Sequence, residues 1–289
     1  MGVVGEAVWQ ACITELAAVK PGNVGLHGDG HDMCVAQFVA SAAAIAPLLD
    51  EPGAGVGERV LAAVRATHAA VGCNTNLGIV LLAAPLARAV LAPPAGRTLR
   101  GRLRAVLAAL TVDDTRDVFA AIRLAAPAGL GESKHHDVHD APAAPLQEVM
   151  RAARRRDRIA AQYANGYRDV FGIGLPAFDA ALANGDDEAG AATAACLAFL
   201  SRVPDSHICR KLGLPAARRT QTLARELHER YLGGAGPKGM ADALLRADRE
   251  LKTRGINPGT SADLTVTTIL AWRLRCVLGR RPTKTDQEE

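Results

Sequence analysis

Apolar residues recur three and four positions apart along nearly the whole chain, which is the spacing of one face of an α-helix. No window of four to eight residues shows the alternation of a half-buried strand. The pattern predicts helices over residues 3–19, 32–49, 56–71, 76–91, 98–110, 113–126, 146–170, 175–184, 187–201, 205–212, 216–232, 238–254 and 261–278. We therefore predict an all-α fold, a single compact bundle of about a dozen helices.

Residues 1–279 are expected to form one helical domain, followed by a polar tail over residues 280–289. The longest irregular stretch, residues 127–145, is charged and rich in histidine. Loops of that length are usually functional or mobile.

Composition limits the function without naming it. Hydrophobic residues make up 49% of the chain and aromatic residues only 3%, which favours helices over strands. A net charge of +4 suits an anionic small molecule and, with so few aromatic residues, disfavours nucleic-acid binding. Six cysteines without a C-x-x-C pair, and no apolar run of roughly 18 residues, predict a reduced, cytoplasmic protein that does not enter a membrane.

One segment concentrates reactive side chains among glycines. Residues 20–33 hold Lys20, His27, His31, Asp29 and Asp32 between two alanine-rich helical segments. Their glycines allow the backbone to approach a ligand closely. A ligand-binding loop and an ordinary Gly/Pro turn are both compatible with this spacing.

Carboxylates also continue the apolar faces of predicted helices. These residues are Glu15, Asp32, Asp114, Asp157 and Asp263. An ionised carboxylate in an apolar interior is unfavourable unless it is paired or binds a metal, so several of them predict a central polar pocket. Asp32, Asp114 and Asp263 lie near predicted helix starts and could be N-caps instead. Glu15 and Asp157 fall inside predicted helices, where an arginine partner would be the alternative.

Helix starts supply further candidate sites. Asn74 or Thr75 would cap the apolar helix that follows, and a helix N-terminus can bind an anion. Residues 257–263 join a Pro/Gly turn to hydroxyls that could hold a phosphate or a ribose. The arginines at 151, 154, 155 and 158 recur on one helical face. The favoured interpretation is a solvated basic face, and the alternative is contact with a phosphate. His135, His136 and His139 match no standard zinc spacing and indicate a mobile surface loop.

Several motifs together resemble those of the triphosphoribosyl-dephospho-CoA synthases, and they occur in the same order along most of the chain. They are Lys20-Pro21-Gly22, Gly30-His31-Asp32-Met33 with Phe38 and Ser41, Asn74-Thr75 with Gly78, Asp205-Ser206-His207, and Pro258 to Leu264. The resemblance rests on the order of the whole set. The resemblance implies an all-helical, magnesium-dependent transferase.

The chain departs from the family pattern at one motif. Where the family usually has His-Lys-Gly, this chain has Asn76-Leu77-Gly78. The segments 117–132 and 156–160 are similar to a branch found with tetrahydromethanopterin-linked one-carbon pathways. The resemblance thus implies either dephospho-CoA or, preferably, a sugar-alcohol-bearing precursor of that cofactor as the acceptor.

In the family reaction a hydroxyl attacks ribose C1′ of ATP and adenine leaves, while the triphosphate stays on the transferred ribose. By resemblance, His31, Asp32 and Asp263 are the expected catalytic residues. Asp32 and Asp263, backed by Asp157 and Glu15, are the expected Mg²⁺ ligands. The expected nucleotide contacts are Lys20, Gly22, Asn74, Thr75, Asn76, Gly259, Thr260 and Ser261.

Two functions of different classes follow. The first is an ATP-dependent triphosphoribosyl transferase whose partners are ATP and a small hydroxyl-bearing acceptor. The second is a non-catalytic nucleotide-binding protein that kept the fold. Release of free adenine only when an acceptor is present separates the first from the second. A homodimer is possible in either case.

Overall fold

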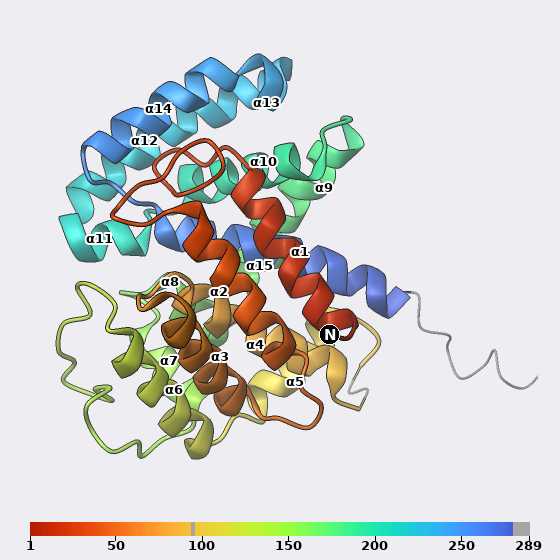
Figure 1. Ribbon diagram of the computed structural model, residues 1–289, viewed down its shortest axis with the longest axis vertical. Coiled ribbons are helices and arrows are strands. Elements are labelled where there is room, and N and C mark those ends of the chain that lie inside the picture. The colour runs from red at the N-terminus through yellow and green to blue at the C-terminus, as the bar shows by residue number, and fades with distance from the viewer. Residues whose placement is uncertain (94–95, 280–289) are drawn as a thin grey trace, which may run out of the picture.

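The computed structural model describes residues 1–93 and 96–279, so the predicted tail 280–289 lies outside the described residues. Within these ranges the chain is helical and has no β-strand, only the isolated bridges Gly25–Gly28 and Gly30–Met33. The prediction of an all-α bundle is confirmed (Figure 1).

The helices follow the predicted ranges closely. Their bounds are α1 Val3–Ala17, α2 Val35–Leu49, α3 Val56–Val71, α4 Leu77–Leu91, α5 Leu99–Ala108, α6 Val112–Ala125, α7 Leu146–Ala153, α8 Arg158–Asn165, η1 Val170–Gly174, α9 Leu175–Ala183, α10 Glu188–Arg202, α11 Ser206–Leu212, α12 Leu214–Arg230, η2 Tyr231–Ala235, α13 Gly236–Gly239, α14 Ala241–Thr253 and α15 Gly259–Gly279. The segment η1 is π-helical, whereas η2 contains a kink at Gly234, whose φ of 94° is not helical.

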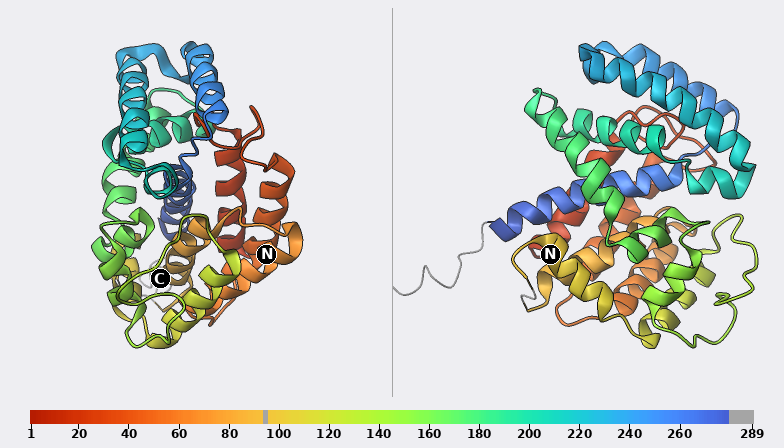
Figure 2. Two further views of the ribbon diagram at one scale, coloured as in Figure 1. Left: turned by 90° about the vertical axis from the view of Figure 1, so that its left-hand side faces the viewer. Right: turned by 180° about the vertical axis from the view of Figure 1, so that it is seen from behind.

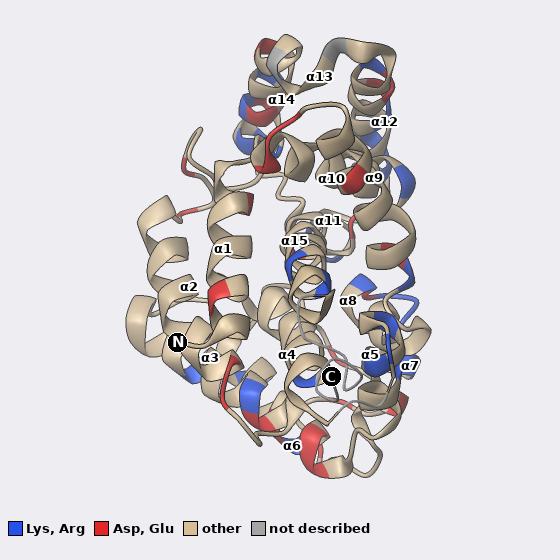
Figure 3. Ribbon diagram, turned by 90° about the vertical axis from the view of Figure 1, so that its right-hand side faces the viewer, with Lys and Arg blue, Asp and Glu red and all other residues tan. Residues whose placement is uncertain are grey.

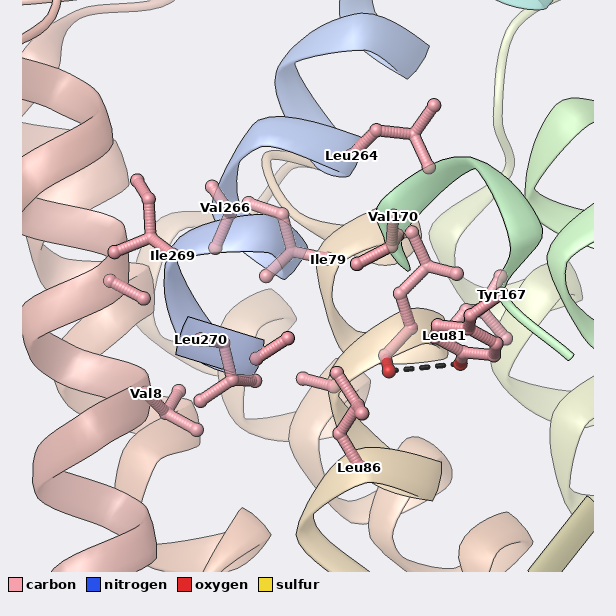
Figure 4. Packing of buried hydrophobic residues seen from close by; sticks show 14 of the residues in the cluster. Val8, Ile79, Leu81, Leu86, Tyr167, Val170, Leu264, Val266, Ile269 and Leu270 are labelled. Atoms are coloured by element: carbon pink, nitrogen blue, oxygen red, sulfur yellow. Dashed lines mark hydrogen bonds between the residues drawn. The ribbon is translucent and has the colours of Figure 1, made fainter. Parts of the chain in front are cut away.

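Helix α15 lies at the centre of the molecule and contacts α1, α4 and α10 (Figures 1 and 2). Its apolar residues Ile269 and Leu270 pack with Val8 of α1 and Leu86 of α4 in the main core (Figure 4). Because α15 is surrounded on several sides, its N-terminal end is held rigidly inside the bundle.

The predicted helix over residues 146–170 is broken. Helix α7 ends at Ala153, a turn covers residues 154–156, and α8 begins at Arg158. Asp157 is the N-cap of α8, and its Oδ1 accepts hydrogen bonds from the backbone N–H groups of Ile159 and Ala160, at 2.8 and 3.0 Å. The expectation that Asp157 lies inside a helix is therefore wrong, because its own side chain starts a new one.

The predicted start of the second helix is also wrong. Helix α2 begins at Val35, and Asp32 lies in the preceding loop with an exposed side chain. Ala36 and Ala43, which the periodicity places on an inward face with Asp32, are exposed as well. The cause is the left-handed backbone of Asp32, whose φ of 60° is incompatible with a continuing helix.

Pro85 creates a local demand for hydrogen bonds inside α4. Proline has no N–H, so the carbonyl of Leu81 has no helical partner. The buried hydroxyl of Tyr163 donates to this carbonyl at 2.6 Å, and the hydroxyl of Tyr167 donates to the carbonyl of Leu82 at 3.0 Å. Two buried tyrosines thus attach α8 and the turn after it to α4.

Replacing Tyr163 by phenylalanine should lower the free energy of unfolding by about 1–3 kcal/mol, because a buried carbonyl loses its donor. Chemical denaturation of the purified variant measures this. An unchanged stability would show that the carbonyl finds another partner.

All six cysteines are free thiols, as predicted. Burial raises the pKa of Cys12 and of Cys196 to about 12, whereas Cys276 is exposed. Since the thiolate is the reactive form, an aromatic disulfide reagent at pH 8 should label Cys276 quickly. Cys12 and Cys196 should react only after denaturation, and fast labelling of either in the native protein would contradict the packing.

No helix in the described ranges is long and apolar enough to cross a membrane.

Candidate active site

A cavity of about 1280 Å³ opens between the N-terminal ends of several helices and the segment that follows α6. Its wall includes Asn74–Ile79 around the start of α4 and Arg154–Ala160 in the turn before α8 and its first residues. From α15 it includes Gly259, Thr260, Ala262 and Asp263. It is larger than a site for one drug-sized ligand, which commonly measures about 300–1000 Å³. The volume therefore exceeds what one such ligand fills.

Three helix starts are joined beside this cavity by side-chain hydrogen bonds. The Ser206 hydroxyl accepts the N–H of Arg158, the first residue of α8, at 3.1 Å. The Thr260 hydroxyl of α15 accepts the N–H of His207 at 3.1 Å and lies 3.0 Å from the Ser206 hydroxyl. Helices α8, α11 and α15 thus point their N-termini, and hence the positive ends of their dipoles, at one region.

The buried carboxylate of Asp205 holds the same junction together. Its Oδ1 accepts the N–H groups of His207 and Ile208, at 2.9 and 3.1 Å, and so caps α11. Its Oδ2 accepts both the N–H and the hydroxyl of Ser261, at 2.7 and 2.8 Å. Asp205 therefore fixes the position of α11 relative to α15.

Asp263 differs from Glu15, Asp157 and Asp205 because none of the described residues donates a hydrogen bond to its side chain. Burial, reinforced by the charges of Asp205, Glu15 and Asp157, raises its pKa well above the usual range. Since α15 begins at Gly259 and Asp263 accepts no backbone N–H through its side chain, the capping alternative does not apply to it. Its carboxyl group faces the cavity without a protein partner.

Gly78 makes room for this carboxyl group. A Cβ atom at residue 78 would lie 2.0 Å from Oδ2 of Asp263, so a larger residue there would force this carboxyl group to move. Glycine thus lets the start of α4 approach the carboxyl group closely. The N-cap residue of α4 is Asn76, not Asn74 or Thr75 as expected, and its side chain makes no capping bond. Asn74 Oδ1 instead accepts the N–H of Leu77, the first residue of the helix, at 3.1 Å.

His31 reaches the cavity from the glycine-containing loop, residues 18–34. Both His31 and Asp32 have positive φ, at 58° and 60°, which is rare for residues other than glycine. The Nε2–H of His31 donates to the carbonyl of Gly22 at 2.8 Å. Because a carbonyl only accepts, Nε2 carries the proton and Nδ1 of the neutral ring keeps its lone pair.

Lys20 and Glu15 form a buried ion pair beneath this loop. The Lys20 ammonium donates to Glu15 and also to Asn23 Oδ1 and the Val24 carbonyl, at 3.0 and 2.9 Å. All three of its donors are therefore used within the protein. Glu15 lines the cavity and Lys20 does not.

The predicted site residues divide into two groups. Those on the cavity wall are Glu15, His31, Asn74, Thr75, Asn76, Asp157, Gly259, Thr260 and Asp263. Those off the wall are Lys20, Gly22, Asp32 and Ser261. Gly22 and Ser261 are bound to Asp248 and Asp205, and Asp32 is exposed to solvent. The structure thus brings His31 and Asp263 to one cavity and leaves Asp32 outside it.

The structure also places the remaining charged residues that the sequence singled out. Asp114 is a capping residue, since its Oδ2 accepts the N–H of Thr111 at 2.8 Å. Asp157 accepts from Arg210 at 3.1 Å, as an arginine-paired carboxylate should. Helix α7, the turn after it and the start of α8 carry a concentration of arginines, and Arg154, Arg155 and Arg156 line the cavity (Figure 3). His135 and His136 line it too.

In the described ranges, no three His, Cys, Asp or Glu side chains lie close enough together to hold a metal ion. The protein therefore has no ready-made metal cage there. Mg²⁺, however, is usually held by one or two carboxylates with water and substrate phosphates. The unpartnered carboxyl group of Asp263 fits that mode of binding.

The sequence did not single out His207 as a site residue. His207 lines the cavity, its Nε2 is buried without a partner, and its ring packs against Gly259. Burial and the neighbouring charges of Arg210, Lys211 and His31 lower its pKa to about 4, so it is neutral at pH 7. The Asp205-Ser206-His207 motif at a helix start was a usable signal for it.

Comparisons with known proteins agree on one family. A family model described as ATP:dephospho-CoA triphosphoribosyl transferase matches residues 1–282. A crystal structure from Archaeoglobus fulgidus, described as a "putative triphosphoribosyl-dephospho-coA synthase", is 25% identical and superposes with a TM-score of 0.62. The match covers 84% of this chain and 100% of that one. No curated protein sequence matches significantly.

The family model spans nearly all of the chain, and the solved structure shares its fold over its own full length. Part of each resembling motif except Lys20-Pro21-Gly22 lines the same cavity, including His31, Asn74, His207 and Asp263. The chain is therefore a transferase that belongs to the ATP:dephospho-CoA triphosphoribosyl transferase family.

Proposed function

We propose that the cavity binds ATP with its triphosphate near the N-termini of α15 and α4, and that an acceptor hydroxyl attacks ribose C1′. The C1′–N9 bond breaks, adenine leaves with the bonding pair and gains a proton, and the triphosphate stays on the transferred ribose. The observation that carries the proposal is Asp263, whose carboxyl group has no protein partner at the meeting point of the helix N-termini.

Phosphate binding is supported by the helix ends and their polar side chains. Free N–H groups and the positive end of the dipole attract anions at a helix N-terminus. Asn74, Thr75, Asn76, Gly259 and Thr260 border the cavity at these ends. Asn76 keeps its Nδ2 donor unpartnered while its Oδ1 accepts from Thr67 at 3.0 Å. These residues are the proposed contacts to the nucleotide.

Asp263 and His31 supply the proposed chemistry. The ribose develops positive charge at C1′ as adenine departs, and a carboxylate nearby stabilises that charge. The lone pair on His31 Nδ1 is free to accept the proton of the attacking hydroxyl. Glu15 and Asp157 add negative charge at the edge of the cavity while remaining paired with Lys20 and Arg210.

Magnesium is proposed as the metal that accompanies ATP. Asp263 would hold it together with phosphate oxygens, and the bound metal would neutralise triphosphate charge. Asp157, on the cavity wall, is the candidate second carboxylate. Because Asp32 is exposed and off the wall, it is not part of the proposed site.

The proposed acceptor is a sugar-alcohol-bearing precursor of tetrahydromethanopterin, and dephospho-CoA is the alternative. Asn76 and Leu77, where this chain departs from the usual His-Lys of the family, lie on the cavity wall. Val118, Phe119 and Arg156, from the segments that resemble the one-carbon branch, also lie there. Both differences therefore concern residues that a substrate can contact.

The test is an adenine-release assay with the purified protein, ATP and Mg²⁺. Each acceptor is added separately, and product mass is measured. We expect one adenine per acceptor consumed and a mass increase equal to one triphosphoribosyl group. Release of ADP or phosphate instead of adenine would contradict the proposed reaction. Turnover with dephospho-CoA but with no sugar-alcohol-bearing acceptor would contradict the proposed acceptor.

A further inference from the structure

Helix α14 does not line the cavity, yet it holds the loop that carries His31. The carboxylate of Asp248, 5% exposed, accepts the N–H of Gly22 at 2.9 Å through Oδ1. Its Oδ2 accepts from the Lys252 ammonium at 2.9 Å, and the same ammonium donates to the carbonyl of Gly28 at 2.8 Å. A charged pair on α14, made of the buried Asp248 and the partly buried Lys252, thus binds the loop at two backbone positions.

Gly22 links this pair directly to the imidazole. Its N–H donates to Asp248 and its carbonyl accepts the Nε2–H of His31, at 2.9 and 2.8 Å. Gly22 has a φ of 86°, and a Cβ there would lie 2.8 Å from the carbonyl oxygen of Ile256. The position of the Gly22 carbonyl is therefore set by α14 and the turn after it, and this carbonyl selects the tautomer of His31.

Asp248 is not needed to build α14. It lies in the interior of the helix, so it caps neither end. An exposed pair on the same helix, Glu250 and Arg254, has the same i,i+4 spacing and the same N–O distance of 2.9 Å without contacting the loop. Burying a charged group is unfavourable unless its partners compensate. We therefore expect Asp248 and Lys252, which face inward, to have a function that the exposed pair does not have.

We propose that Asp248, assisted by Lys252, is a positioning residue for His31. It fixes Gly22, and Gly22 holds the imidazole with Nε2 protonated and Nδ1 available on the cavity side. This inference rests on the proposed function, in which His31 accepts a proton. Orientation of a catalytic group matters because a displacement of about 1 Å can lower the rate about a hundredfold.

The first measurement is the tautomer of His31 in protein labelled with ¹⁵N-histidine, with its signals assigned by the His31→Gln variant. In the unmodified protein near pH 8 we expect the Nε2–H form alone. In Asp248→Ala we expect a mixture of both tautomers, because Gly22 is released. The matched control is Glu250→Ala, which should leave the His31 signals unchanged.

The second measurement is turnover by the same variants. We expect kcat of Asp248→Ala to fall about ten- to a hundredfold, with KM for ATP changed less than about twofold because the nucleotide contacts remain. Asp248→Asn, which keeps an acceptor for Gly22, should recover part of the loss. Should Asp248→Ala fail to fold, Lys252→Met should show a smaller change in the same direction.

Two results would overturn the positioning role. One is a folded Asp248→Ala protein with unchanged His31 tautomer, whatever its activity. The other is a kcat equal to that of Glu250→Ala. A failure of the proposed function can be told apart from a failure of the positioning role. Normal turnover by His31→Gln would refute the proton transfer by His31. The tautomer measurement would still decide whether Asp248 orients the ring.

Discussion

Replacing Asp263 by asparagine is expected to lower kcat by about 10²–10³-fold, comparable to removing one electrostatic contact to a transition state. The asparagine side chain has nearly the same shape, so the cavity and the contact with Gly78 remain. What would be lost is the carboxyl group that we propose as the charge beside C1′ and as the ligand for the metal. Steady-state adenine release at saturating ATP, Mg²⁺ and acceptor measures the effect.

The same substitution should not destabilise the protein. At pH 7 the unfolded Asp263 carboxyl is ionised, whereas burial raises its pKa in the folded state. Because the folded-state pKa is raised, keeping the Asp263 carboxyl folded has no ionisation cost below the unfolded pKa, near 4. As the pH rises above that value, the free energy of unfolding of the parent protein falls. The Asp263→Asn variant should therefore be at least as stable as the parent at pH 7, and the difference should shrink toward pH 4.

The control is Asp113→Asn, which removes an exposed carboxylate that pairs with Arg116 on the surface. It should change neither kcat nor stability appreciably. If Asp263→Asn kept full activity, Asp263 would have no role in the reaction. A marked loss of stability at pH 7 would instead contradict the conclusion that the Asp263 carboxyl group has no protein partner.

Replacing His31 by glutamine is expected to lower kcat by about 10²–10⁴-fold, the range for loss of a general base. Glutamine can still donate to the Gly22 carbonyl, so the loop keeps its shape, but it cannot accept a proton from the attacking hydroxyl. KM for ATP should change little. The assay is again adenine release, measured with a saturating acceptor.

His27→Gln provides the matched control for this variant. His27 lies in the same loop, and its Nε2 also donates to a backbone carbonyl, that of Ala17, at 3.1 Å. Unlike His31, it is exposed and does not line the cavity. Equal losses in the two variants would mean that the loop matters only structurally.

Helical periodicity was sufficient to predict the all-α fold from the sequence, because most of the helices bury one apolar face. The range 56–71 agrees with α3 residue for residue. The break before α8 was missed because Asp157 continues the apolar spacing of α7 while its side chain caps a new helix. Periodicity alone cannot distinguish a carboxylate that faces a core from one that bends back to its own backbone.

The candidate site was only partly accessible to sequence reasoning. Asp263 and His31 were identified from their motifs, and both line the cavity. Asp32 was misplaced because positive φ at two successive non-glycine residues has no reliable sequence signal. The contacts of Gly22 with Asp248 join residues 226 positions apart, and no local pattern encodes such a contact. The homodimer and the cytoplasmic location stay predictions.

A crystal structure of the protein with ATP and Mg²⁺, in the absence of an acceptor, tests the central claim most directly. We expect the triphosphate at the N-termini of α15 and α4, the metal bound to Asp263, and ribose C1′ facing Nδ1 of His31 across the space left for an acceptor. A nucleotide bound outside this cavity, or inside it with Asp263 turned away from both metal and ribose, would contradict it.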